Sequence, residues 1–275
     1  MYCKRHGSGR STTRRKIVRL YTVYTDAETA PNAPMPTQTF IAFDADDTLW
    51  PCQPHYDHVE AQLLRILSHY ADTATLNARL YDVQRANMQL FGYGAKSFML
   101  SMIETIIQVS NGAVTGNEIQ QILDLGKDLL RFPIEPLPDV VEVLTELKQR
   151  GHQLILLTKG DLFDQESKIA RSGLGDFFDY VEIVSEKDVP TYNRLFTRLG
   201  ATPGNFVMIG NSLKSDILPV ARLGFPAIHI PYHANWIHEH VPAELLAEVE
   251  FRAVKALREV LDLVRSREVP PVARP

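Results

Sequence analysis

The sequence predicts an α/β fold: a doubly wound, mostly parallel sheet with an inserted helical domain. After Thr39, short apolar runs alternate with segments that carry apolar residues at helical spacing. This order is typical of parallel sheets covered by helices. One long segment, residues 55–132, breaks the order with helical patterns and no strand pattern, which indicates a separate helical domain.

The strand and helix patterns can be followed in order along the chain. The predicted strands are FIAFD (40–44), HQLILLT (152–158), YVEIVS (180–185), NFVMIGN (205–211), PAIHIPY (226–232) and a short one within VEFRAV (249–254). The helices between them are predicted at 139–150, 164–172, 191–199, 215–223 and 256–265, with Gly151 and Gly173 ending the first two.

The insertion contains four helical patterns, and three prolines mark the return of the chain to the sheet. The patterns are HVEAQLLRILSHYA, LNARLYDVQRANMQLF, KSFMLSMIETIIQV and TGNEIQQILDLGKDLL, and the prolines are Pro133, Pro136 and Pro138. We therefore expect a core of residues 37–54 and 133–265 and a helical domain of residues 55–132. Residues 1–36 are predicted to be a basic, disordered extension, and residues 266–275 a mobile tail.

Composition narrows the class of protein and its partners. Residues 1–35 carry seven Lys or Arg against two acids, which leaves 22 basic and 31 acidic residues in the rest of the 275-residue chain. That acidic body argues against a nucleic-acid partner. The apolar runs are far shorter than the roughly 20 residues of a membrane span, and two cysteines, Cys3 and Cys52, cannot form a disulfide framework. A cytoplasmic protein is expected, with an N-terminal extension that is dispensable or misassigned rather than a targeting signal.

Polar residues gather where the predicted strands end. They are Asp44, Asp46, Asp47 and Thr48 after the first strand, Thr158 and Lys159 at the second, Glu186 and Lys187 after the third, and Asn211, Ser212 and Asp216 after the fourth. The carboxyl ends of parallel strands share one edge of a sheet, where ligands bind. Crowded carboxylates need a cation or a lysine among them. An oxygen-only ligand set favours Mg²⁺, which shares its positions with phosphate oxygens.

Four segments in this order, DADDTL (44–49), LLTKG (156–160), EKDVPTY (186–192) and GNSLKSD (210–216), resemble the motifs of the haloacid dehalogenase (HAD) superfamily. The resemblance covers most of Phe40 to about Tyr232. It implies a Rossmann-like core, and the helical insertion resembles the cap of the superfamily's C1 members.

The resemblance implies a role for each motif residue. Asp44 is the expected nucleophile, and Asp46 is the acid that protonates the leaving oxygen and then accepts a proton from water. Thr158 and Lys159 are expected to bind the phosphate, and Lys187 to neutralise its charge. The implied Mg²⁺ ligands are Asp44, the backbone carbonyl of Asp46, Asn211 and Asp216. Asn211 departs from the family's usual Asp, whereas the acid at Asp46 argues against dehalogenation.

Other polar and aromatic residues carry weaker signals. In FGYGAKSF (91–98), Tyr93 or Lys96 could read the leaving group, or the turn could be a helix–helix corner with Phe91 and Phe98 in the core. Asp47 is expected to form a turn, Cys52 to be a small hydrophobe and Trp236 to pack or line the pocket rim. The histidines at 229, 233, 238 and 240 lack the HExxH pattern of a zinc site.

These observations predict a Mg²⁺-dependent phosphatase that hydrolyses a small phosphorylated metabolite through an aspartyl-phosphate, without a nucleic-acid or membrane partner. Two alternatives remain open from sequence: a phosphomutase of the same fold, and a phosphometabolite-binding regulatory protein with little turnover. The substrate and the oligomeric state are not predicted.

Overall fold

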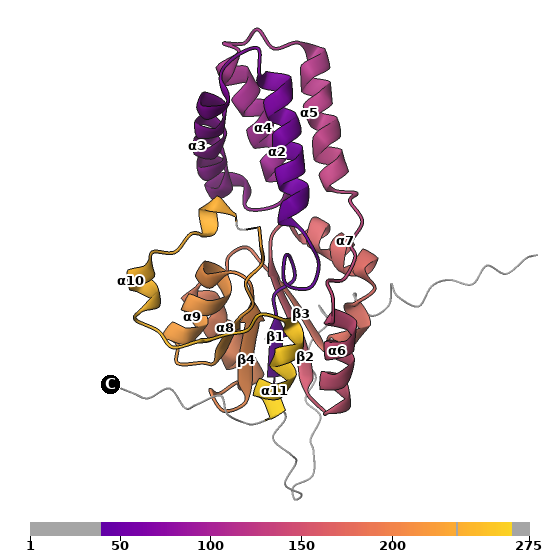
Figure 1. Cartoon of the computed structure of the whole chain (residues 1–275), viewed down its shortest axis with the longest axis vertical. Helices are drawn as coiled ribbons and strands as arrows, with labels where there is room; N and C mark the ends of the chain where they lie inside the picture. The colour runs from indigo at the N-terminus through magenta and orange to yellow at the C-terminus, as the bar shows by residue number, and fades with distance from the viewer. Residues whose placement is uncertain (1–39, 235, 266–275) are drawn as a thin grey trace, which may run out of the picture. The chain divides into compact units, whose positions relative to one another are not determined.

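A six-stranded sheet, parallel at every pairing, forms the centre of the core in the order β3-β2-β1-β4-β5-β6. The computed structural model describes residues 40–234 and 236–265, so the predicted extension and tail lie outside the described residues. The strands are β1 (Phe40–Phe43), β2 (Gln153–Lys159), β3 (Tyr180–Val184), β4 (Phe206–Gly210), β5 (Ala227–His229) and β6 (Arg252–Ala253). The predicted doubly wound α/β fold is confirmed (Figure 1).

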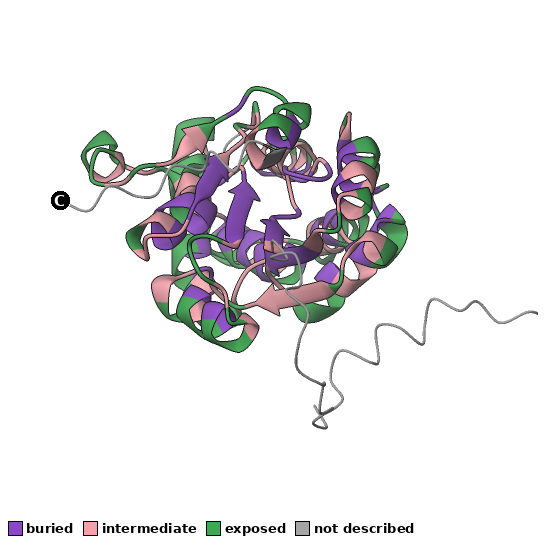
Figure 2. Ribbon diagram, turned by 90° about the horizontal axis from the view of Figure 1, so that it is seen from below, coloured by how far each residue is buried: buried purple, intermediate pink, exposed green. Residues whose placement is uncertain are grey.

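Helices cover both faces of the sheet, so its central strands are buried on both sides. Successive residues of β1 show this: Ile41 and Phe43 join one apolar cluster, and Ala42 joins the other. The helices α6 (Val140–Gln149), α7 (Leu162–Ser172) and α11 (Val260–Arg265) pack on the first face. The helices α8 (Val189–Leu199) and α9 (Leu218–Arg222) pack on the second. Figure 2 shows the buried strands enclosed by these half-exposed helices. Burial on both faces is why the strands read as continuous apolar runs.

Local signals explain where the core helices begin and end. The carboxylates of Asp161 and Asp188 accept hydrogen bonds from the backbone N–H groups of Asp164 and Thr191, which caps α7 and α8. Both helices end at a glycine with positive φ, Gly173 and Gly200.

The helix predicted at 215–223 starts differently. A turn of π-helix, Leu213–Ile217, precedes α9, and the Ser212 hydroxyl caps it by accepting from the N–H of Ser215. A π-turn accommodates one extra residue and is common at functional sites. Here the wide turn brings Asp216 back against the end of β4, with its carboxylate accepting from the N–H of Ser212 at 3.0 Å.

The cap consists of four helices with their own apolar cluster, which includes Leu63, Met102 and Ile122. They are α2 (Gln53–Leu67), α3 (Thr73–Phe91), α4 (Ala95–Val109) and α5 (Gly116–Leu129). Figure 1 shows them side by side beyond the carboxyl ends of the strands. Helix α2 starts at Gln53, two residues before the predicted boundary at 55, which as a domain boundary stays a prediction. Within the described residues, no helix is both long and apolar enough to span a membrane.

Candidate active site

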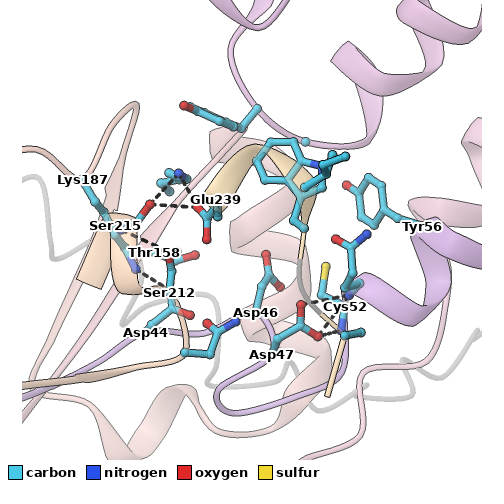
Figure 3. A pocket seen from close by; sticks show the side chains of 18 of the residues that line it. Asp44, Asp46, Asp47, Cys52, Tyr56, Thr158, Lys187, Ser212, Ser215 and Glu239 are labelled. Carbon is cyan, nitrogen blue, oxygen red and sulfur yellow. Dashed lines mark hydrogen bonds and ion pairs between the residues drawn. The ribbon is translucent and has the colours of Figure 1, made fainter. Parts of the chain in front are cut away.

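A cavity of about 820 Å³ lies between the carboxyl ends of the strands and the cap. Its floor includes Asp44, Asp46, Thr158, Lys187 and Asp216, which come from four separate strand ends. Its other walls come from α2, α3, α4 and the loop after β5, with Tyr56, Gln84, Tyr93, Ser97 and Trp236 among them. Figure 3 shows Asp44, Thr158 and Lys187 on one side of the pocket and Asp46, Asp47 and Cys52 on the other.

Asp44 and Asp216 are two buried carboxylates that share one ammonium group. Lys187 Nζ bonds Asp44 Oδ1 and lies 2.7 Å from Asp216 Oδ1. Burial raises the pKa of Asp44 to about 7 despite the attraction of Lys187, and the nearby charge of Asp216 adds to the rise. Burial also raises the pKa of Asp216. For Lys187, burial alone would lower the pKa, but the two carboxylates raise it overall. Lys187 is therefore charged, and a second cation beside the two carboxylates would favour the ionisation of both.

Asp46 is held by donors on three side chains. Its carboxylate accepts from Trp50 Nε1 at 2.8 Å, Gln165 Nε2 at 2.9 Å, and Lys168 Nζ at 2.9 and 3.1 Å. Burial favours the neutral acid, but Lys168 and these hydrogen bonds outweigh it and lower the pKa of Asp46 below its ordinary value. The resting Asp46 is therefore a carboxylate.

Gln165 and Lys168 are site residues that the sequence motifs did not predict. Both lie on the inner face of α7 and are almost fully buried. The sequence did contain a signal for them. Gln165, Lys168 and Ser172 share one face of the predicted helix with the apolar residue Ile169. Polar residues on a stripe that packs against a sheet need partners, which here lie in the site.

Asp47 has the structural role that the sequence predicted. Its backbone has a φ of 63°, in the left-handed region. Its carboxylate accepts from the N–H groups of Cys52 and Gln53, at 2.7 and 3.0 Å, where α2 begins. Burial raises the pKa of Asp47 to about 7. This residue therefore fixes the connection from β1 to the cap.

Lys159 and Tyr93 both line the pocket and contact each other. Lys159 Nζ lies 2.7 Å from Glu239 Oε1, 2.8 Å from Ser215 Oγ and 4.3 Å from the centre of the Tyr93 ring. The Tyr93 hydroxyl donates to Glu186 at 2.5 Å. Thr158, at the end of β2, is buried and faces the same cavity. Glu239 also lines the pocket and was not predicted from the sequence.

Lys96 is not brought into the pocket. Its ammonium pairs with Asp161 at 2.8 Å and lies 5.5 Å from the centre of the Phe163 ring. Of the two aromatic residues that flank the turn, Phe98 is buried but Phe91 is 54% exposed. Each alternative for this turn therefore holds in part. Tyr93 lines the cavity, Phe98 packs in the cap cluster and also lines the cavity, and Lys96 pairs with Asp161 of the core.

The oxygen donors needed for Mg²⁺ lie together at the ends of β1 and β4. The Thr48 hydroxyl lies 3.0 Å from Asp44 Oδ2 and 3.2 Å from Asn211 Oδ1, and it accepts from the Asn211 N–H at 3.1 Å. The described residues contain no cluster of three His, Cys, Asp or Glu side chains suited to a metal. The set here is two carboxylates, one amide and a backbone carbonyl. This set fits Mg²⁺, because its donors are all oxygen and its two carboxylates are buried side by side.

A family model for haloacid dehalogenase-like hydrolases matches residues 39–224, more than half of the chain. The chain belongs to this family. A solved structure of a haloacid dehalogenase-like family hydrolase from Xanthomonas campestris is 36% identical, with a TM-score of 0.75, and the match covers 86% of this chain and 95% of that one. The predicted superfamily is thereby confirmed.

Curated relatives of this HAD-family chain carry phosphatase names. N-acylneuraminate-9-phosphatase from Mus musculus is 37% identical over 198 residues, covering 68% of this chain and 79% of the relative. Glyceraldehyde 3-phosphate phosphatase from Methanopyrus kandleri is 25% identical over 232 residues, covering 82% and 96%. The enzyme of that name from Methanothermobacter thermautotrophicus is 28% identical over 134 residues, covering 46% of this chain and 59% of the relative. The predicted enzyme class, a HAD-like phosphatase, is confirmed.

Proposed function

We propose that this HAD-family phosphatase hydrolyses the phosphate monoester of a small sugar or polyol, in a Mg²⁺-dependent reaction that passes through an aspartyl-phosphate on Asp44. The observation that carries the proposal is the buried group of Asp44, Lys187 and Asp216 beside Asp46, at the floor of the cavity between the strand ends and the cap. The names of the relatives, which refer to phosphorylated sugars, support the substrate class.

Asp44 would attack phosphorus while the bond from phosphorus to the leaving oxygen breaks. Asp46 would give that oxygen a proton. The resting Asp46 is ionised, but a phosphate monoester has a second pKa of about 6, so a bound monoanion can supply the proton. In the second half, Asp46 would accept a proton from water as the water oxygen attacks phosphorus and the bond to Asp44 breaks.

Charge neutralisation in both steps falls to Lys187 and the bound cation. Lys187 would compensate charge on the transferring group, and Thr158 would donate a hydrogen bond to a phosphoryl oxygen. Asp44, Asn211, Asp216 and the Asp46 carbonyl would hold Mg²⁺, which supplies positive charge to a phosphoryl oxygen when bound. Asn211 brings less charge than an aspartate, so we expect modest Mg²⁺ affinity.

The upper wall of the cavity suits a hydroxyl-rich leaving group. Most of its polar groups are amides and hydroxyls, and Glu60 on α2 adds one carboxyl group; the amides and hydroxyls are Gln53, Gln84, Ser97, Ser101, Tyr56 and Tyr93. Amides and hydroxyls donate to and accept from sugar hydroxyls, and a carboxylate accepts from them. A volume of about 820 Å³ lies well within the range of small-molecule sites.

The test is phosphate release from a panel of sugar and polyol monophosphates, with Mg²⁺ and with EDTA. We expect turnover that EDTA removes, and a loss of roughly 10⁴-fold or more in Asp44→Asn. Mass spectrometry should find one phosphate on Asp44 after a rapid acid quench. Activity retained by Asp44→Asn would refute the covalent mechanism, and isomerisation of a phosphosugar without phosphate release would favour the phosphomutase.

A further inference from the structure

Helix α7 supplies two side chains to Asp46 that none of the four sequence motifs contains. Lys168 Nζ contacts both carboxylate oxygens of Asp46, at 2.9 and 3.1 Å, and Gln165 Nε2 contacts Oδ2 at 2.9 Å. Lys168 is 1% exposed, so water does not compete with Asp46 for its ammonium group. A lysine is seldom buried without a charged partner, because desolvating an ammonium group is costly.

The surroundings of Lys168 indicate that Asp46 is its main partner. Two other polar atoms lie near Nζ. Cys52 Sγ, at 3.6 Å, is a weak acceptor, and Asp164 Oδ2, at 3.7 Å, is beyond hydrogen-bond distance. The carboxylate oxygens of Asp164 have no hydrogen-bond partner among the described residues. Lys168 therefore directs its short contacts to Asp46 even though a second, unsatisfied carboxylate lies beside it.

We propose that Lys168, assisted by Gln165, is a positioning residue that fixes the orientation of the Asp46 carboxylate for both proton transfers. The proposal rests on the proposed function above. Asp46 would give a proton to the leaving oxygen and later take one from water. Its carboxylate must therefore keep the same position in both steps. Two donors on a rigid helix hold it there, and an error of about 1 Å in such a group can cost roughly 100-fold in rate. Lys168 itself is not expected to contact the phosphate.

A double-mutant cycle on kcat tests this role, with the wild type, Lys168→Met, Asp46→Asn and the double variant. We expect Lys168→Met to lower kcat by roughly 10- to 100-fold with little change in KM. In the Asp46→Asn background the same change should have almost no effect, because there is no acid left to position. The matched control is Lys148→Met, which removes an exposed lysine paired with Asp179 at 2.7 Å and should leave kcat unchanged.

Three results would overturn the proposal. A wild-type kcat in Lys168→Met would exclude any role in turnover, a raised KM with normal kcat would indicate a substrate-binding lysine, and equal losses in both backgrounds would indicate a structural role. If Lys168→Met does not fold, Lys168→Gln, which keeps a donor, and Gln165→Leu enter the same cycle. A wild type that releases no phosphate would refute the proposed function itself, so the two failures are distinguishable.

Discussion

At the scale of single residues, Gly210 shows how closely the site is packed. A Cβ at this position would lie 2.2 Å from Asp216 Oδ2 and 2.4 Å from its Cγ. Heavy atoms at these distances cannot coexist, so the residue that ends β4 has no side chain because the Asp216 carboxylate occupies that space. The glycine of GNSLKSD is therefore explained by the packing of a carboxylate rather than by backbone conformation.

We predict that Gly210→Ala displaces Asp216 and weakens Mg²⁺ binding by about 10-fold or more, as changes beside metal ligands commonly do. The measurement is the rise in thermal midpoint on adding Mg²⁺, which does not depend on activity. The control is Gly204→Ala, where the nearest atom to a new Cβ is Thr202 Oγ1 at 3.9 Å. An unchanged Mg²⁺ response in Gly210→Ala would show that Asp216 does not help to bind the ion.

The sequence predicted which residues meet at the edge of the sheet, but not which residues hold them in place. Asp44, Thr158 and Lys187 follow strands, and the register of a parallel sheet places strand ends together, so their meeting could be predicted. Lys168 reaches Asp46 from the middle of a helix, and its distance depends on how α7 rotates against the sheet. Lys96 lies three residues from Tyr93, yet pairs with Asp161, because helix α4 turns it away from the cavity. Spacing alone does not give these rotations.

At the scale of elements, the segment after β5 connects core and cap. Its short helix, Ile237–Glu239, places Glu239 against Lys159 and Ser215 of the core. The neighbouring His238 stacks on Tyr81 of α3, with ring centres 4.4 Å apart, and contacts Gln84 at 3.1 Å. Trp236 lines the cavity, at the position where the sequence suggested packing or a pocket rim.

The ion pair of Glu239 predicts a pH-dependent stability. Burial would raise the pKa of Glu239, but Lys159 and the hydrogen bonds from serine hydroxyls lower it below the ordinary 4.5. A carboxyl whose folded pKa is lowered stabilises the fold above its unfolded pKa, and this contribution is lost as the pH falls through the folded value. We expect Glu239→Gln to lower the thermal midpoint more at pH 7 than at pH 4.

The control for this prediction is Glu244→Gln, a change at an exposed glutamate on α10 (Ala243–Leu246). It should have a small effect at either pH. If Glu239→Gln lowers the midpoint equally at pH 7 and pH 4, the stabilisation by Glu239 comes from packing rather than from its charge.

At the scale of the whole fold, the described residues contain separate apolar clusters in the cap and on each sheet face. The sequence predicted this separation, since the strand patterns stop at the insertion. The sequence could not predict the π-turn before α9. The segment is short, so the spacing of its apolar residues does not distinguish a regular helix from one with an extra residue. Tertiary contacts of Asp216 decide that geometry.

Separate clusters predict separate responses to mutation. Leu63→Ala, at a fully buried position in the cap, should cost about 2–5 kcal/mol in cap stability. Amide hydrogen exchange should then rise in α2–α5 while the strands stay protected, and the Mg²⁺-dependent rise in the thermal midpoint should remain. Leu144→Ala, at an equally buried position on α6, is the matched change and should expose the sheet instead. Uniform exchange after either change would show a single cooperative unit.

The junction at Asp47 has a consequence for engineering chimeric enzymes. The Asp47 carboxylate accepts from the N–H groups of Cys52 and Gln53 at the start of α2. The proposed catalytic residues Asp44 and Asp46 and the attachment of the cap therefore lie within one short segment, residues 44–53. A foreign cap transplanted after Gln53 would inherit this attachment without any change to Asp44. Grafts that keep residues 44–53 should therefore exchange substrate preference between family members, whereas grafts cut before Asp47 should lose turnover along with specificity.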